Sequence, residues 1–319
     1  MATTTQSPLS EDQIDRLIES MADSYGQQAR SPILQSPAEQ GLDFEEISFQ
    51  ATDGVPIEGW FIPAAGSDKL IIANHPRGFS RAGMPSHLEP WKSVWERSGN
   101  GFEIDFLPDY KILHDAGYNV LTYDLRNHGH SSAANGGIVS SGLFESRDVL
   151  GSLRYARERQ DTSAMTVGLF SRCLGANSTM YAMAREPRAF DSVRCLVACQ
   201  PLTPSSIARR LLILAGVPDE RVADSLAELD RRMVLRTSIS FAQRDVKEWA
   251  KTIRTPTFIY QVRDDILTTR DDVQTIFDNL SAADKDLLWI ENSTARWDGY
   301  AEFQRRPTPM LQWFATHLG

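Results

Sequence analysis

The chain has 319 residues, of which 41% are hydrophobic and 24% charged, and its formal net charge is −9. This composition is ordinary for a globular protein, and the length suits one large α/β domain with insertions. An acidic chain is not attracted to nucleic acid or anionic membranes, so we expect neither as a partner. No run of 18 apolar residues and no signal-peptide pattern is present, so we expect a cytoplasmic protein. The three cysteines are too few and odd in number for a disulfide framework.

The first 42 residues predict an N-terminal helix and a linker. Apolar residues recur at helical spacing over residues 11–24, and Ser10 can cap this segment. Residues 30–41 hold two prolines and predict a surface linker. Two strand-like runs, 44–51 and 57–63, then predict a β-hairpin across Thr52-Asp53-Gly54.

From residue 70 onward, strand and helix patterns alternate, which predicts βαβ units and a mainly parallel sheet flanked by helices. The chain therefore divides into a core (residues 43–200 and 254–319) and an inserted segment (201–253). We expect strands at 70–73, 120–124, 165–170, 192–200, 257–262 and 285–291, and helices at 109–116, 144–158, 176–184, 271–279 and 302–317.

Two insertions follow carboxyl ends of predicted strands, where open α/β sheets bind ligands. Residues 78–107 carry Trp91 and Trp95, and residues 201–253 contain two helical patterns, at 206–214 and 221–234. We expect both to act as lid segments, the second as a helical lid; the alternative is a surface loop and a helical decoration.

Residues 165–183 read MTVGLFSRCLGANSTMYAM, an apolar strand that turns abruptly into a helix. A tight strand-to-helix turn that presents a nucleophile needs small residues two positions before and two after it. Ser171 and Gly175 fill those positions, which makes Cys173 the candidate nucleophile. The unpaired N–H groups of the helix start favour its thiolate, and the N–H of Leu174 is one candidate oxyanion donor. The alternative is a small buried cysteine in the core.

Three motifs resemble the α/β-hydrolase family from about residue 43 to the end: Asn74-His75-Pro76-Arg77-Gly78, the run from Tyr123 to Ser131, and the turn at Cys173. The cysteine nucleophile is similar to the dienelactone-hydrolase branch, although that branch usually has glycine where Ser171 stands. The resemblance implies an α/β-hydrolase fold with a mostly parallel sheet and a helical lid. It also implies a second oxyanion donor after the first parallel strand, where Pro76 has no N–H and Arg77 is the aligned residue.

The resemblance places the acid of a catalytic triad after the strand at 257–262, where Asp265 is the first candidate and Asp264 the second. The histidine should follow the last strand, but residues 292–300 contain none, and Ala295 stands in the expected place. Either a histidine has been replaced by alanine to silence the enzyme, which we favour, or the natural protein lacks the base.

These residues predict a cysteine-dependent hydrolase or acyltransferase for a small-molecule ester, lactone or thioester, impaired in turnover. A carbon–carbon bond hydrolase or cyclase is the first alternative, because Trp91, Trp95 and Trp297 suit an aromatic ligand. The second is a non-catalytic ligand-binding protein. His75 is a further candidate in the substrate pocket, with a loop-shaping role as the alternative. No pattern predicts a cofactor or a metal, and a homodimer is compatible with the sequence although no segment marks an interface.

Overall fold

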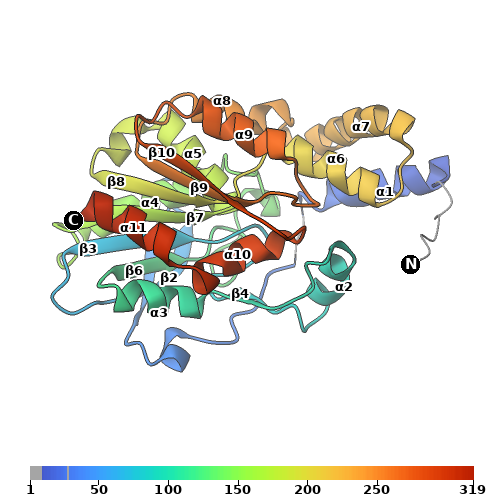
Figure 1. Cartoon of the computed structure of the whole chain (residues 1–319). Coiled ribbons are helices and arrows are strands. Elements are labelled where there is room, and N and C mark those ends of the chain that lie inside the picture. The colour runs from blue at the N-terminus through green and yellow to red at the C-terminus, as the bar shows by residue number, and fades with distance from the viewer. Residues whose placement is uncertain (1–8, 27–28) are drawn as a thin grey trace.

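A computed structural model describes residues 9–26 and 29–319, and its centre is one eight-stranded sheet with helices on both faces (Figure 1). The strand order is β1-β2-β6-β3-β7-β8-β9-β10. Six strands, β6, β3, β7, β8, β9 and β10, run parallel to one another. Strand β2 runs antiparallel to both β1 and β6. The predicted parallel sheet and N-terminal hairpin are therefore confirmed. The strands are β1 (Glu45–Gln50), β2 (Pro56–Ile62), β3 (Lys69–Asn74), β6 (Asn119–Tyr123), β7 (Thr166–Arg172), β8 (Val193–Cys199), β9 (Thr257–Val262) and β10 (Lys285–Ile290), with β4 (Gly83–Met84) and β5 (Ile104–Asp105) forming a separate small ribbon.

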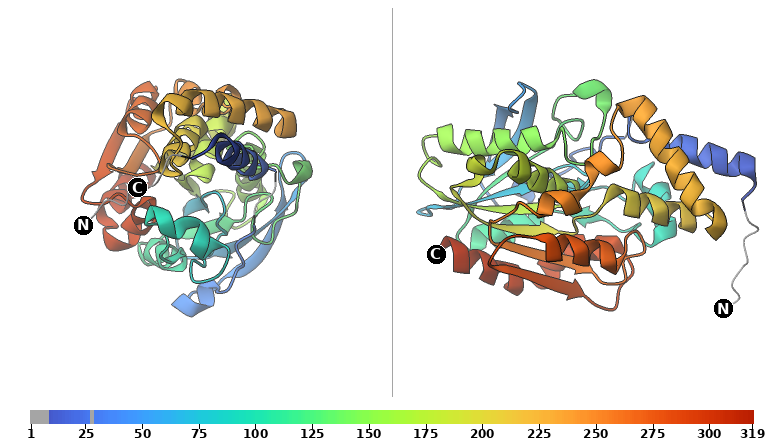
Figure 2. Two further views of the ribbon diagram at one scale, coloured as in Figure 1. Left: turned by 90° about the vertical axis from the view of Figure 1, so that its right-hand side faces the viewer. Right: turned by 90° about the horizontal axis from the view of Figure 1, so that it is seen from above.

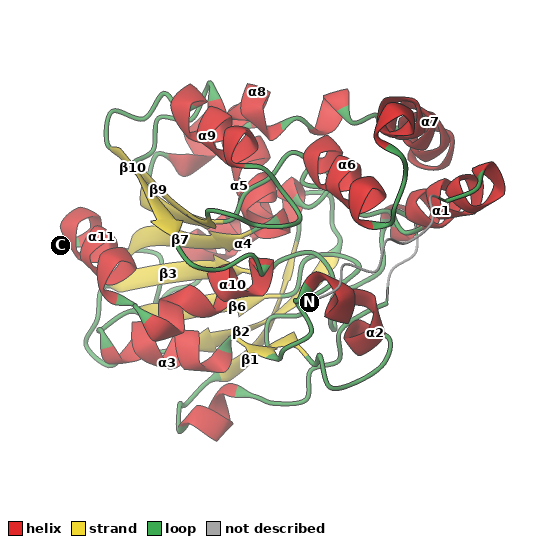
Figure 3. Ribbon diagram, turned by 45° about the vertical axis from the view of Figure 1, so that its right-hand side comes forward, coloured by secondary structure: helices red, strands yellow, loops and turns green. Residues whose placement is uncertain are grey.

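The two faces of the sheet bury two separate apolar clusters. One lies under α4, α5, α8 and α9, and the other under α3, α10 and α11 (Figures 1 and 3). The central strands are apolar on both faces, as expected for a parallel sheet covered on both sides. The covering helices are α3 (Leu107–Asp115), α4 (Ser146–Glu158), α5 (Leu174–Arg185), α8 (Val246–Ala250), α9 (Arg270–Asn279), α10 (Arg296–Arg305) and α11 (Thr308–Leu318).

A third apolar cluster lies beyond the sheet, where α1 (Glu11–Asp23), α6 (Pro204–Leu214) and α7 (Asp219–Thr237) pack together. We call these three helices the cap. Figure 2 shows α1 alongside α7, although the two helices lie about 200 residues apart in the chain. Ser10 caps α1 as predicted, with its Oγ accepting from the N–H of Gln13. Exposed ion pairs join α1 to α7, among them Arg232 with Glu19 at 2.9 Å.

The segment predicted to form one helical lid, residues 201–253, is shared between the cap and the main core. Helices α6 and α7 belong to the cap, but α8 packs on α5 and α9 and contributes Val246 and Trp249 to the main core. The small helix α2 (Trp91–Trp95) stands apart at the same end of the molecule (Figure 1).

The prediction of one closing helix over residues 302–317 is wrong. The structure has two helices, α10 and α11, separated at Arg306, whose φ of −145° and ψ of 71° are not helical. Pro307 causes this break, because a proline ring excludes the α conformation from the residue before it.

Candidate active site

The connection between β7 and α5 holds Cys173 in a strained backbone conformation, with φ +48° and ψ −105°. Non-glycine residues adopt such angles at a cost of about 1–3 kcal/mol, and they concentrate at functional sites. Cys173 is the N-cap of α5, and its N–H donates to the carbonyl of Cys199 on β8 at 2.8 Å. The thiol is half-buried and borders a cavity, whereas Cys195 and Cys199 are fully buried.

The flanking residues of this turn are small because the end of β3 lies against them. A Cβ added to Gly175 would come within 2.0 Å of the Asn74 side-chain oxygen. Ser171 pairs with Asn74 across the sheet, and its hydroxyl is hydrogen-bonded to that of Thr179 at 2.9 Å. The strand–turn–helix geometry predicted around Cys173 is therefore present.

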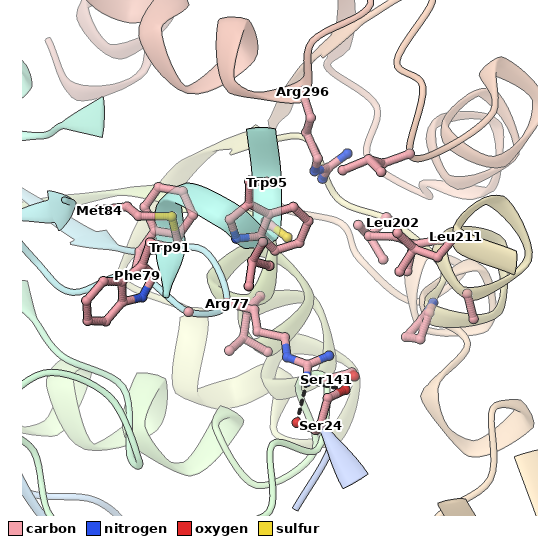
Figure 4. A pocket seen from close by; sticks show the side chains of 18 of the residues that line it. Ser24, Arg77, Phe79, Met84, Trp91, Trp95, Ser141, Leu202, Leu211 and Arg296 are labelled. Atoms are coloured by element: carbon pink, nitrogen blue, oxygen red, sulfur yellow. Dashed lines mark hydrogen bonds between the residues drawn. The ribbon is translucent and has the colours of Figure 1, made fainter. Parts of the chain in front are cut away.

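Cys173 opens into a cavity of about 410 Å³ between the sheet end, α2 and the cap. Figure 4 shows Trp91, Trp95, Met84 and Phe79 along one side and Leu202 and Leu211 along the other. The cap adds Met21 and Tyr25. The three tryptophans singled out from the sequence all line this cavity, and the Trp95 and Trp297 rings lie 4.9 Å apart. The lining is mostly apolar, and its charged members among the described residues are the arginines Arg77 and Arg296.

Asp265 is buried, whereas Asp264 is exposed and pairs with Arg270. One oxygen of Asp265 accepts from Arg296 Nη1 at 2.6 Å, and both side chains are at most 2% exposed. Three neutral donors complete the carboxylate: Thr268 Oγ1 at 2.9 Å, Gln261 Nε2 at 3.1 Å and the Leu267 N–H at 2.9 Å. The residue that the sequence resemblance assigns to the acid of a triad therefore binds an arginine and not a histidine.

Arg296 is fixed by its neighbours as well as by Asp265. Its Nε donates to the hydroxyl of Tyr300 at 3.0 Å, and its Nη2 donates to the carbonyl of Gln200. Burial opposes the charge of the guanidinium, but Tyr300 and Asp265 raise the pKa of Arg296 well above its ordinary value. Arg296 is a permanent cation and cannot accept a proton.

Tyr300 connects Arg296 to the nucleophile. It lies one turn after Arg296 on α10, lines the cavity, and its hydroxyl interacts with the Cys173 thiol. Burial raises the pKa of Tyr300 well above its ordinary value, so the phenol stays protonated at neutral pH. Since Arg296 must be the donor in its bond to Tyr300, the phenol hydrogen is available to the sulfur.

Ala295 is the N-cap of α10 and is half-buried. Its N–H donates to the hydroxyl of Ser293 at 3.0 Å. The neighbouring Arg296, and not residue 295, sends its side chain to Asp265.

The loop after β3 carries Arg77, whose side chain points toward the cap (Figure 4). Its guanidinium donates to the carbonyl of Ser24 at 2.7 Å and lies over the Tyr25 ring at 4.6 Å. The N–H of Gly175 donates to the carbonyl of His75 at 3.2 Å, which binds this loop to the start of α5.

The prediction that His75 belongs to the substrate pocket is wrong, because its ring is buried behind the loop. Nε2 accepts from the N–H of Leu125 at 2.9 Å, and Nδ1 is bonded to the Pro76 carbonyl at 2.7 Å. Burial lowers the pKa of His75 to about 4, so the ring is neutral. All six histidines lie in the described residues, and none of them lines the cavity.

Sequence reasoning missed Arg296, Tyr300 and the contribution of α1 to the cavity wall. The Arg-Trp-x-x-Tyr spacing after the last strand was a usable signal, since residues four apart share one helix face. Among the described residues, no cluster of three or more potential metal ligands exists. Within the same residues, no helix is both long and apolar enough to cross a membrane.

No protein-family model matches the chain. An uncharacterized 31.7 kDa protein of the traX-finO intergenic region of Escherichia coli is 21% identical over 243 residues, which cover 64% of this chain and 82% of that protein. The esterase Pf2001 of Pyrococcus furiosus superposes with a TM-score of 0.65 and 19% identity, over 92% of this chain and all of that one. A dienelactone hydrolase of Anabaena variabilis superposes with a TM-score of 0.54 and 14% identity, over 87% and 99%. The chain therefore has the α/β-hydrolase fold, which confirms the predicted fold class.

Proposed function

We propose that the chain is a hydrolase or acyltransferase in which Cys173 forms an acyl-enzyme with a small-molecule ester, lactone or thioester. The strained backbone of Cys173 at the floor of an apolar cavity carries this proposal. The Cys173 thiolate attacks the substrate carbonyl carbon, the bond to the leaving group breaks so that this group departs with the electron pair, and the acyl group stays on sulfur. The N–H groups of Leu174 and Arg77 are the proposed donors to the oxyanion.

We further propose that Asp265 acts through Arg296 and Tyr300 in the place of a triad histidine. A fixed cation and a phenol donor stabilise a thiolate, but neither removes a proton from water at neutral pH. Release of the acyl group to water should therefore be slow. The complete set of partners around Arg296 favours a natural protein without the histidine over one silenced by a change at Ala295.

The test is incubation with a p-nitrophenyl alkanoate, whose leaving group departs without protonation, followed by intact-mass and peptide mass spectrometry. We expect one acyl adduct on Cys173 and none in Cys173→Ala. An unmodified Cys173 would contradict the proposal and favour a ligand-binding protein.

A paired substitution tests the role of the arginine position. Arg296→His places an imidazole beside Asp265, and we expect deacylation to accelerate by about 10²-fold or more, the lower range of general base catalysis. Ala295→His should change deacylation little because Arg296 still holds the carboxylate. Faster deacylation in Ala295→His than in Arg296→His would support the loss of a histidine at position 295.

The tryptophan lining favours a second candidate, a carbon–carbon bond hydrolase or cyclase for an aromatic substrate. Screening esters against β-diketones with the wild-type chain and Arg296→His separates the two. Turnover of diketones alone would favour this candidate.

A further inference from the structure

Among the described residues, no carboxylate and no imidazole lines the cavity beside Cys173, and this restricts the substrate. The Cys173 sulfur interacts with the phenol of Tyr300 and with the charge of the Arg296 guanidinium, and all three side chains line the same cavity. Asp265 lies behind Arg296. Its Oδ2 atom accepts hydrogen bonds from three donors, one of which is the Arg296 guanidinium. Asp265 does not line the cavity, so its oxygens do not meet a bound substrate.

The phenol hydrogen of Tyr300 is also directed by this network. Arg296 Nε donates to the phenol oxygen at 3.0 Å, and the hydroxyl of Tyr300 interacts with the sulfur of Cys173. In the proposed arrangement the phenol hydrogen points to the sulfur, and it does not protonate the leaving group. A leaving group must consequently depart as its own anion.

We propose that the natural substrate is an acyl thioester with an apolar acyl group, which Cys173 accepts and passes to a second thiol. This inference rests on the proposed acyl-cysteine chemistry. The Cys173 thiolate attacks the thioester carbonyl, the new C–S bond forms, and the old C–S bond breaks to release a thiolate. No proton is gained or lost in the exchange, and transfer to the second thiolate reverses the same step.

Leaving-group basicity separates thioesters from oxoesters at this site. A thiol has a pKa of about 8.5, so its thiolate departs as readily as Cys173 itself would. An alkoxide is about as basic as hydroxide, whose conjugate acid has a pKa of about 16, and needs a proton to depart. Proton donation to such a group contributes at least about 10²-fold to its departure.

The cavity fits the acyl half of such a substrate. It holds about 410 Å³ and is walled by tryptophan, methionine and leucine side chains (Figure 4). No acidic side chain of the described residues lines it, so no carboxylate of this lining opposes the negative charge that develops on the carbonyl oxygen.

The experiment compares an octanoyl thioester of N-acetylcysteamine with the octanoyl oxoester of N-acetylethanolamine, which differ only in sulfur or oxygen. The acylation rate of Cys173 is followed by intact mass, and the thioester-to-oxoester ratio is divided by the same ratio for free cysteine. We expect this normalised ratio to be at least about 10², the minimum contribution of the missing acid. A normalised ratio near one would overturn the inference while leaving the acyl-enzyme intact.

Two variants make the outcomes distinct. Tyr300→Phe should slow acylation by both substrates equally; a selective loss with the oxoester would show that Tyr300 protonates the leaving group and would overturn the inference. Cys173→Ala should give no adduct. If wild-type Cys173 reacts with neither octanoyl ester nor with the p-nitrophenyl alkanoate, the proposed function itself fails.

Discussion

The buried ion pair between Arg296 and Asp265 provides a quantitative test of the site. Arg296→Met keeps an unbranched side chain but removes the charge, and it leaves a carboxylate that is 1% exposed without its cation. Breaking a buried pair from one side costs 3–5 kcal/mol, and three neutral donors remain on Asp265, so we expect a loss of about 3 kcal/mol.

Urea unfolding followed by tryptophan fluorescence measures this loss. Asp265→Asn completes a double-mutant cycle, in which we expect a coupling free energy of about 2 kcal/mol. The matched control is Arg263→Met, since Arg263 forms a bond of similar length, 2.7 Å, with Glu291, but both side chains are at least 33% exposed. Exposed pairs contribute up to about 1 kcal/mol. Equal losses for the two arginine variants, or strict additivity in the cycle, would refute the proposed role of the buried pair.

Three further predictions concern reactivity, the turn and pH. Iodoacetamide should alkylate Cys173 but not Cys199, because burial raises the pKa of the Cys199 thiol to about 12; peptide mapping checks this, and equal labelling would contradict it. Gly175→Ala should destabilise the fold by about 2 kcal/mol and abolish labelling of Cys173, because the new methyl group overlaps Asn74; calorimetry showing a gain in stability would be the opposite result. The pKa of His75 is about 4 in the folded state and about 6.5 when unfolded, so the unfolded state binds the proton first as pH falls. The free energy of unfolding should therefore fall by up to about 3 kcal/mol between pH 6.5 and 4. Urea unfolding should show a weaker dependence of this free energy on pH in His75→Asn, and an unchanged dependence would count against the burial argument.

The turn at Cys173 was predictable because its determinants are local. A strand pattern, two small flanking residues and a helix pattern lie within 20 residues, and steric crowding accounts for each. The parallel sheet was likewise predictable, because strand and helix patterns alternate along the chain. The break at Arg306 could also have been predicted, because Pro307 follows it directly.

The partner of Asp265 could not be predicted in the same way. Arg296 lies 31 residues away and next to the position that the family pattern assigns to histidine. Which of two adjacent side chains reaches a carboxylate depends on where α10 begins. The cap posed a similar problem, since the apolar stripe of α1 shows that one face is buried but does not identify α7 as its neighbour.

The hydrogen bond from Arg77 to Ser24 connects the position of α1 to the position of the loop after β3. Arg77 belongs to the loop that we propose supplies an oxyanion donor, and its side chain holds the end of α1, which forms part of the cavity wall. A displacement of α1 away from Arg77 would break this hydrogen bond and remove one contact between α1 and the loop. A ligand whose entry displaces α1 would thereby couple its binding to the position of the loop beside Cys173.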